Sequence, residues 1–216
     1  MRPASLGYRL LIRHNASKSR SKISLENFES NKTVEPLIYE RLYLNRFVTD
    51  QRKLSDMKLG NSDMGYAGCE IISVYNALML LRDVGSISKE DDEKGSCGLL
   101  ISNMIRKAET GGFLVRFGLW GTNPLWLPEF AAEYGLKLEK CENTLPQAAG
   151  IYILSFWNSK KLSHGAHTVC MEFKEDHIMA YNYHYSDKPL KYDHARLEEE
   201  FASNGKSLIA VFKVVE

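Results

Sequence analysis

The feature that most constrains the fold is a change in the spacing of apolar residues near residue 150. Before this point, apolar side chains recur every three or four positions in 69–83, 99–107 and 127–134, which is typical of helices. After it, short runs rich in aromatic and branched residues predict strands. These runs are 151–157, 166–173, 178–182 and 208–215. Helices followed by such strands predict an α+β fold.

Two shorter signals indicate how the strands are connected. Glu175 and Asp176 separate two of the predicted strands and favour a tight turn, which would make those strands antiparallel. Residues 193–202 favour a short helix before the last strand. We expect the antiparallel sheet to pack against the helix that begins at Cys69, because both surfaces are too apolar to stand alone.

The length of the chain, 216 residues, suits one domain with a buried core. Apolar residues make up 44% of the chain and charged residues 25%, as in ordinary globular proteins. Residues 1–32 are rich in Ser, Arg, Lys and Asn with few large apolar side chains, so we expect a flexible basic arm. An organelle-targeting segment is the alternative for this stretch. Residues 33–216 are expected to form the single domain.

Composition also narrows the classes of partner. Lys and Arg number 28 against 27 Asp and Glu, and no basic stripe with interleaved aromatics occurs, so we expect no nucleic acid. The longest apolar runs have the length of strands, so we expect no membrane span and a cytoplasmic protein. The four cysteines are far apart and form no Cys-x-x-Cys pair, which argues against a disulfide framework or a zinc site.

Cys69 is the first candidate for chemistry. A loop with three glycines, residues 60–68, ends where the apolar helix begins at this cysteine. A thiol in the first turn of a helix lies near unpaired amides and the positive end of the dipole, which favour thiolate. Glycines at 65 and 68 are expected to leave backbone amides free to face a substrate oxyanion. The alternative is that Cys69 is a small buried residue of the core.

His167 and Asn182 are the second and third candidates. His167 begins one predicted strand and Asn182 ends the next, so an antiparallel hairpin should make them neighbours. A side-chain amide beside an imidazole can fix its tautomer and aim its other nitrogen at a thiol. His164 is the rival base, and Asp187 is the rival orienting residue.

These residues resemble the papain-like cysteine peptidases, especially the branch of bacteriocin leader-processing peptidases that cleave after double glycine. The resemblance lies in two blocks, 65–81 and 164–182, and covers most of residues 60–215. It implies a papain-like fold and a cysteine hydrolase that cleaves a peptide or protein substrate through an acyl-thioester, without metal or cofactor. By the resemblance, Cys69 is the nucleophile, His167 the general base and Asn182 the orienting residue.

Two positions differ from that family's pattern. The family usually carries a Gln shortly before the Cys, whose amide helps to bind the oxyanion, and here the nearby candidate is Asn61, with Gly68 as a backbone donor. Glu70 stands where the family usually has Gly, Ala or Ser, and an acid there opposes a thiolate. These differences favour an alternative, a catalytically inactive papain-like module that binds a peptide or partner. Acyl transfer and deamidation would use the same residues as cleavage.

Overall fold

The computed structural model describes residues 18–42, 47–83 and 100–215, and all statements about structure refer to these ranges. Its central element is a six-stranded antiparallel sheet in the order β5-β10-β6-β7-β8-β9. The strands are β5 (Lys137–Lys140), β6 (Gly150–Trp157), β7 (Ala166–Phe173), β8 (Ile178–Tyr181), β9 (Leu190–Tyr192) and β10 (Ser207–Val215). The mixture of helices and an antiparallel sheet confirms the α+β class.

The four strands expected from the sequence are present with bounds that differ by at most one residue. β6 and β7 pair over their full lengths, from Gly150 opposite Phe173 to Trp157 opposite Ala166. The turn predicted at Glu175 and Asp176 joins β7 to β8, and the Lys174 N–H donates to the His177 carbonyl across it at 2.8 Å. β5 and β9 were not predicted, because each is short and β5 is composed mainly of exposed charged residues.

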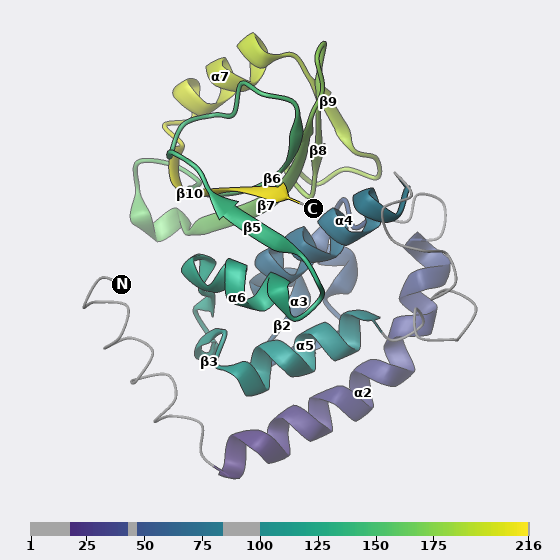
Figure 1. Ribbon diagram of the computed structural model, residues 1–216. Helices are drawn as coiled ribbons and strands as arrows, with labels where there is room; N and C mark the ends of the chain where they lie inside the picture. Colours follow the sequence, from purple (N-terminus) through teal and green to yellow (C-terminus); the bar gives the residue numbers. More distant parts are fainter. Residues whose placement is uncertain (1–17, 43–46, 84–99, 216) are drawn as a thin grey trace.

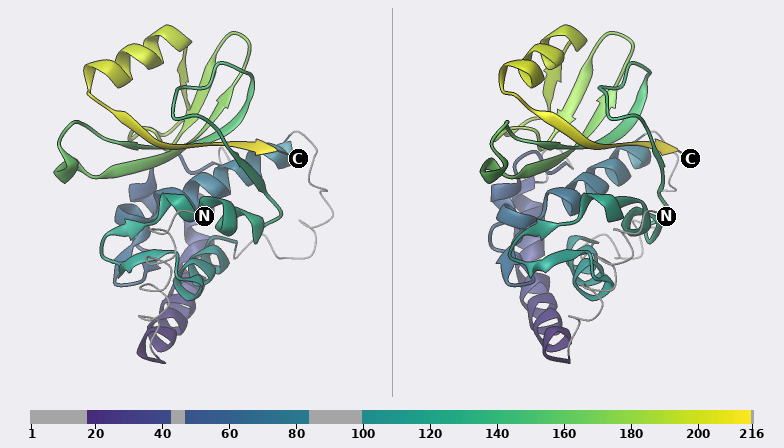
Figure 2. Two further views of the ribbon diagram at one scale, coloured as in Figure 1. Left: turned by 60° about the vertical axis from the view of Figure 1, so that its left-hand side comes forward. Right: turned by 90° about the vertical axis from the view of Figure 1, so that its left-hand side faces the viewer.

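Helices lie on both sides of this sheet, as Figures 1 and 2 show. On one side are α2 (Lys18–Leu42), α3 (Met64–Ala67), α4 (Cys69–Asp83), α5 (Leu100–Gly111) and α6 (Leu127–Ala132), with the 3-10 helices η1 (Gln51–Leu54) and η4 (Pro124–Trp126). On the other side is α7 (His194–Ser203). Short strands form two hairpins in the helical part, β1 (Lys58–Leu59) with β2 (Ser62–Asp63) and β3 (Leu114–Gly118) with β4 (Gly121–Thr122). A further 3-10 helix, η5 (Leu162–His164), precedes β7.

Helix boundaries follow the local signals in the sequence. Asn123 accepts from the Leu125 N–H at the start of η4, and Asp193 accepts from the Arg196 N–H at the start of α7. After α5 the chain turns at Gly112, whose φ of +78° suits glycine. The sequence also favours a helix start at Ser88, with Asp91 three residues on, and these residues lie outside the described ranges.

The α4 helix packs on the sheet, as expected from its apolar sequence. It is the central helix of the larger core, in which its residues Ile72 and Tyr75 belong to one cluster with Ile153 of β6 and Cys170 of β7. Almost every residue of α4 is buried, so no polar face separates it from the surrounding helices. The prediction that the Cys69 helix packs on the antiparallel sheet is confirmed.

The opposite face of the sheet holds a second, aromatic core covered by α7. Side chains that alternate with those of the first core point to this side, including Phe156 of β6 and Val169 and Met171 of β7. Leu197 and Phe201 of α7 complete the cluster. The two faces of β7 therefore belong to different cores.

Residues 18–32, which we expected to belong to a flexible basic arm, form the first part of α2. The buried side of this helix carries polar residues at helical spacing, so its amphipathic pattern is not visible as an apolar stripe. These buried residues are Ser24, Asn27, Asn31 and Glu35, followed by Ile38. Residues 1–17 lie outside the described ranges.

Hydrogen bonds from this polar stripe join α2 to the rest of the domain. Asn31 exchanges two hydrogen bonds with the backbone of Lys58, at 2.9 and 2.7 Å. The Glu35 carboxylate accepts from the N–H groups of Ile101 and Ser102 at the start of α5, where a negative charge is favoured. α2 is thus an integral part of the helical layer. No helix within the described ranges is long and apolar enough to cross a membrane.

Candidate functional site

Cys69 is the first residue of α4 and lies where this helix meets β7. Its side chain is 9% exposed. The backbone amide of Thr168, in β7, faces the thiol and acts to lower the pKa of Cys69. Two hydroxyl groups occupy the adjoining part of the sheet, where Ser155 and Thr168 are hydrogen-bonded to each other at 2.8 Å and are fully buried. The predicted position of Cys69 at a helix start against the sheet is confirmed.

The polar side-chain partner of Cys69 is its neighbour Glu70. The Cys69 Sγ donates to Glu70 Oε2 at 2.9 Å, and the Thr122 hydroxyl donates to the same carboxylate oxygen. Glu70 is 4% exposed and Thr122, at the end of the β3–β4 hairpin, is also buried. A thiol, a carboxylate and a hydroxyl from two different segments therefore form one buried chain of hydrogen bonds.

The surroundings of Cys69 favour the neutral thiol. Burial raises the pKa of Cys69 well above its ordinary value, and the charge and hydrogen bond of Glu70 raise it further. The amides of Thr168 and Glu70 act in the opposite direction but are weaker. Burial and Glu70 therefore oppose the thiolate that we expected from the position of Cys69 at a helix start.

His167 projects from the other face of β7. Thr168 and Cys170 point toward α4, so their alternate neighbours His167, Val169 and Met171 point toward α7. The half-buried His167 ring lies edge-on against Phe156 of the aromatic core, at 5.9 Å between centroids. The structure does not pair His167 with Cys69. His167 is next to Thr168 in the chain, but Thr168 faces Cys69 and His167 points to the opposite side of β7.

The His167 ring is neutral at physiological pH. Burial lowers its pKa to about 4, and the positive charges of Lys206 and His184 act in the same direction. Its Nε2 donates to the backbone carbonyl of Asn182 at 2.6 Å, which opposes these effects but is weaker. His167 and Asn182 are thus neighbours, as the hairpin predicts, but the contact uses the Asn182 carbonyl and not its side-chain amide.

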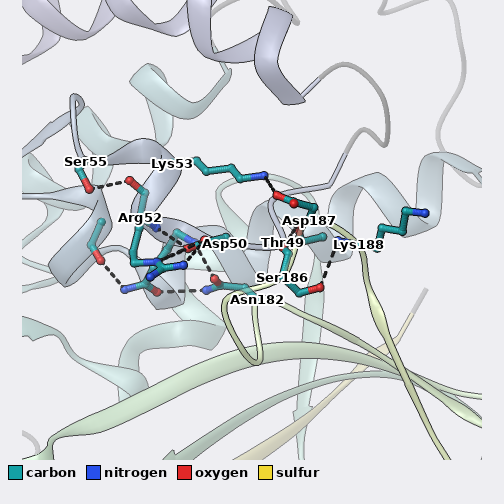
Figure 3. Close-up of polar contacts among 11 residues, drawn as sticks. Thr49, Asp50, Arg52, Lys53, Ser55, Asn182, Ser186, Asp187 and Lys188 are labelled. Atoms are coloured by element: carbon teal, nitrogen blue, oxygen red, sulfur yellow. Dashed lines mark hydrogen bonds and ion pairs between the residues drawn. The ribbon is translucent and has the colours of Figure 1, made fainter.

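The Asn182 side chain points instead toward the segment before α3, as Figure 3 shows. Its Oδ1 accepts from the Gln51 N–H at 2.9 Å, and its Nδ2 donates to Gln51 Oε1 at 3.1 Å. Gln51 Nε2 then donates to the Gly65 carbonyl at 2.7 Å, four residues before Cys69. Asn182 has a φ of +60°, a left-handed conformation that asparagine tolerates better than most residues.

The two predicted oxyanion donors have other contacts. The Gly68 N–H donates to the Met64 carbonyl at 3.1 Å, so the expected free amide at this position is absent. A Cβ at Gly68 would approach that carbonyl to 2.6 Å, which explains the glycine by packing. Asn61 lies in the β1–β2 turn with an exposed side chain, and its N–H donates to the Phe117 carbonyl at 2.8 Å. These contacts of Asn61 are made with β3 and not with Cys69.

The rival residues also have partners away from Cys69. His164 is exposed and its Nδ1 lies 2.9 Å from the Ser159 hydroxyl, while Asp187 forms an ion pair with Lys53 at 2.5 Å. The cysteines of the described ranges, Cys69, Cys141 and Cys170, are all free. Within the same ranges, no cluster of three or more His, Cys, Asp or Glu side chains has an arrangement that would hold a metal ion.

Sequence analysis missed two residues that the structure places at this site, Gln51 and Thr122. Gln51 lies 18 positions before Cys69, farther than the spacing that the family pattern indicates. Thr122 precedes Asn123 and Pro124, and this sequence indicates only the start of a helix. No local signal marks either residue, because their contacts depend on how the η1 and β3–β4 segments fold back on α3 and α4.

Comparisons with protein-family models, with curated proteins and with solved structures find no significant match for this chain. The site is therefore interpreted from its own geometry and chemistry.

Proposed function

We propose that this protein is a papain-like thiol hydrolase in which Cys69 attacks an acyl group of a peptide or protein and Glu70 accepts the thiol proton. The observation that carries the proposal is the 2.9 Å hydrogen bond from Cys69 Sγ to Glu70 Oε2 at the start of α4. A general base must lie within about 3.2 Å of the proton that it takes, and Glu70 meets this condition. The packing of the Cys69 helix on an antiparallel sheet supports the papain-like assignment.

In the proposed reaction the thiol proton moves to Glu70 as the sulfur bonds to the substrate carbonyl carbon. The proton then passes to the leaving amine, the bond to that amine breaks, and an acyl-thioester remains on Cys69. Water hydrolyses the thioester in a second step and restores the thiol. Because the Cys69 pKa is raised, the nucleophile is a neutral thiol that loses its proton during attack, and not a standing thiolate.

Thr122 supports this assignment as the residue that holds the Glu70 carboxylate. Its hydroxyl occupies the same oxygen that accepts from Cys69, which restricts the rotation of the carboxyl group. This is the role of the third group in a nucleophile–base pair. The Cys-His-Asn triad implied by the family resemblance is the competing assignment, and it requires the His167 ring to reach the α4 side of β7.

A second function, the non-catalytic binding module, is favoured by a specific observation. The raised pKa of Cys69 and the position of His167 on the far face of β7 both remove the thiolate–imidazolium pair that such a fold uses for chemistry. In that case the protein would retain the fold and bind a peptide without cleaving it.

Hydrolysis of a fluorescence-quenched peptide library by the wild type, with Cys69→Ser as the baseline, tests the proposal. Two matched variants identify the base. Glu70→Gln keeps the shape of the side chain and should reduce turnover about 100-fold, the usual effect of losing a general base. His167→Gln keeps a donor for the Asn182 carbonyl and should change turnover less than about threefold. The reverse order of these effects would identify His167 as the base, and no turnover above the Cys69→Ser baseline would favour the binding module.

A further inference from the structure

The side chain of Gln51 connects the sheet to the turn that leads into Cys69. It accepts from the Asn182 Nδ2 at 3.1 Å on one side and donates to the Gly65 carbonyl at 2.7 Å on the other. Its own N–H donates to Asn182 Oδ1 at 2.9 Å, so the two residues are joined twice. Gln51 thus links the residue after β8 to α3, whose last residue is separated from Cys69 only by Gly68.

Close packing around Gly65 and Gly68 fixes the backbone that the Gln51 side chain contacts. Gly65 lies so close to the end of η1 that a Cβ at this residue would approach the Ser55 hydroxyl to 2.2 Å. The Gly68 N–H donates to the Met64 carbonyl, so the turn between α3 and α4 has little freedom to move independently. A displacement of Gly65 is therefore transmitted through three residues of tightly packed backbone to Cys69.

Figure 3 shows other polar contacts between the 49–53 segment and the β8–β9 loop. Lys53 pairs with Asp187, but the side chain of Asp187 is 87% exposed, so that pair contributes little. The Arg52 guanidinium lies 3.5 Å above the ring of Tyr185, which is also exposed. Asn182 is only 4% exposed. The less exposed part of the connection consists of the paired amides of Gln51 and Asn182 and the Thr49 hydroxyl, which donates to the Ser186 carbonyl at 2.7 Å. Of these groups, only Gln51 reaches the Gly65 carbonyl before Cys69.

We propose that Gln51 is a positioning residue for Cys69, which holds the start of α4 against β7 by joining Asn182 to the Gly65 carbonyl. This inference concerns the same site as the proposed function and rests on it for the catalytic consequence. It does not make Gln51 a donor to the substrate, because both ends of its amide are already engaged within the protein.

The role is tested by the pH profile of Cys69 alkylation with iodoacetamide in the full chain, followed by peptide mass spectrometry. In Gln51→Ala, the turn before Cys69 loses its link to the sheet and water reaches the sulfur. The alkylation midpoint should move down by about one pH unit, which raises the rate at a fixed pH below the midpoint about tenfold. Cys170, buried in the same core, is the internal reference and should not change.

Three further variants separate positioning from general destabilisation. Gln51→Glu retains an acceptor for Asn182 but loses the donor to Gly65, so it should shift the profile as Gln51→Ala does. Asn182→Gly preserves the left-handed backbone and the carbonyl that contacts His167, and removes only the amide side chain. Addition of Asn182→Gly to Gln51→Ala should shift the alkylation midpoint of Cys69 little further, because the two changes break the same connection. Lys53→Ala, in the same segment, is the control and should leave the midpoint unchanged.

Equal acceleration of Cys170 and Cys69 in Gln51→Ala, or an unchanged Cys69 profile, would overturn the inference. Hydrolysis measured on the same samples separates it from the proposed function. If the wild type cleaves peptides, Gln51→Ala should lower kcat about tenfold or more with little change in KM, since misplacement of a nucleophile affects the transition state. If the wild type cleaves nothing but the profile still shifts, the proposed function fails and the positioning role remains.

Discussion

The two faces of the sheet bury different kinds of polar chemistry. Toward α4 lie uncharged groups, the Ser155 and Thr168 hydroxyls and the Cys69 thiol, with Glu70 beside the thiol. Toward α7 lies an ammonium in an aromatic cluster, where Lys206 Nζ contacts the Tyr183 hydroxyl at 2.8 Å. Which face a strand residue occupies therefore decides which of these two environments its side chain joins.

His167 illustrates the consequence. A shift of one position along β7 would place it on the face of Thr168 and Cys69, but in its observed register it joins Lys206 and the aromatic rings. Its neutral, half-buried state follows from that environment. The face that His167 occupies therefore separates two assignments. On the α7 face it is a structural residue, whereas the role of base for Cys69 requires the α4 face.

The largest effect is expected for Lys206 on the α7 face. Its side chain is 8% exposed and its ammonium contacts Glu200 Oε1 at 3.0 Å. Although burial raises the pKa of Glu200, hydrogen bonds from Lys206, Tyr183 and His184 lower it to about 2. Lys206→Met would leave that carboxylate without its main counter-charge, and should reduce the free energy of unfolding by about 3 kcal/mol.

Urea unfolding at pH 7 measures this loss. Lys174→Met is the matched control, because its ammonium lies 3.2 Å from the Glu172 carboxylate but its side chain is 45% exposed. The control should cost less than about 1 kcal/mol. Similar losses in the two variants would mean that the charges under α7 are solvated, and the contrast between the faces would disappear.

The next largest effect is a loss of folding stability at acid pH that originates at His167. Its pKa is about 4 in the folded protein and 6.5 ordinarily, so its contribution to stability is complete above pH 6.5. The contribution is lost as pH falls from 6.5 to 4, because the unfolded chain binds the proton first, and the total loss is at most about 3 kcal/mol. His167→Gln should remove this pH dependence.

Unfolding free energies at pH 6.5 and 4.5, for the wild type and His167→Gln, measure the effect. Glu200 contributes little to the change between these two pH values. Because its pKa is lowered in the folded protein, its contribution to the free energy of unfolding is lost mainly below about pH 4.5. A wild type with constant stability between these two pH values would show that the ring is hydrated. That result would strengthen the assignment of His167 as the base for Cys69.

The smallest effect is expected on the α4 face, at the hydroxyl pair. Thr168→Val leaves the buried Ser155 hydroxyl without its partner and should cost about 1 to 2 kcal/mol. Addition of Ser155→Ala removes the unpaired group and should recover part of the loss, because the two residues are in contact. Urea unfolding of both single variants and the double variant measures this coupling, and simple additivity would contradict the observed pair.

Much of the fold follows from the sequence because it depends on local patterns. The apolar run after Cys69, the strands 151–157 and 166–173, and the turn between β7 and β8 each arise from residues adjacent in the chain. The approach of His167 to Asn182 follows in turn from an antiparallel hairpin with that turn. Helix α2 did not follow, because the face that it buries is made of Asn, Ser and Glu, whose burial depends on partners elsewhere in the chain.

By itself the sequence determined the α+β class, the start of α4 at Cys69 and the nearness of His167 to Asn182. Only the tertiary structure decided which side chains meet at the site. The face occupied by His167 depends on the register of β7 against β6, the partner of Cys69 on the position of Thr122, and the link to Gln51 on the packing of η1 against α3. Such contacts arise between segments far apart in the chain, and residue spacing alone carries no information about them.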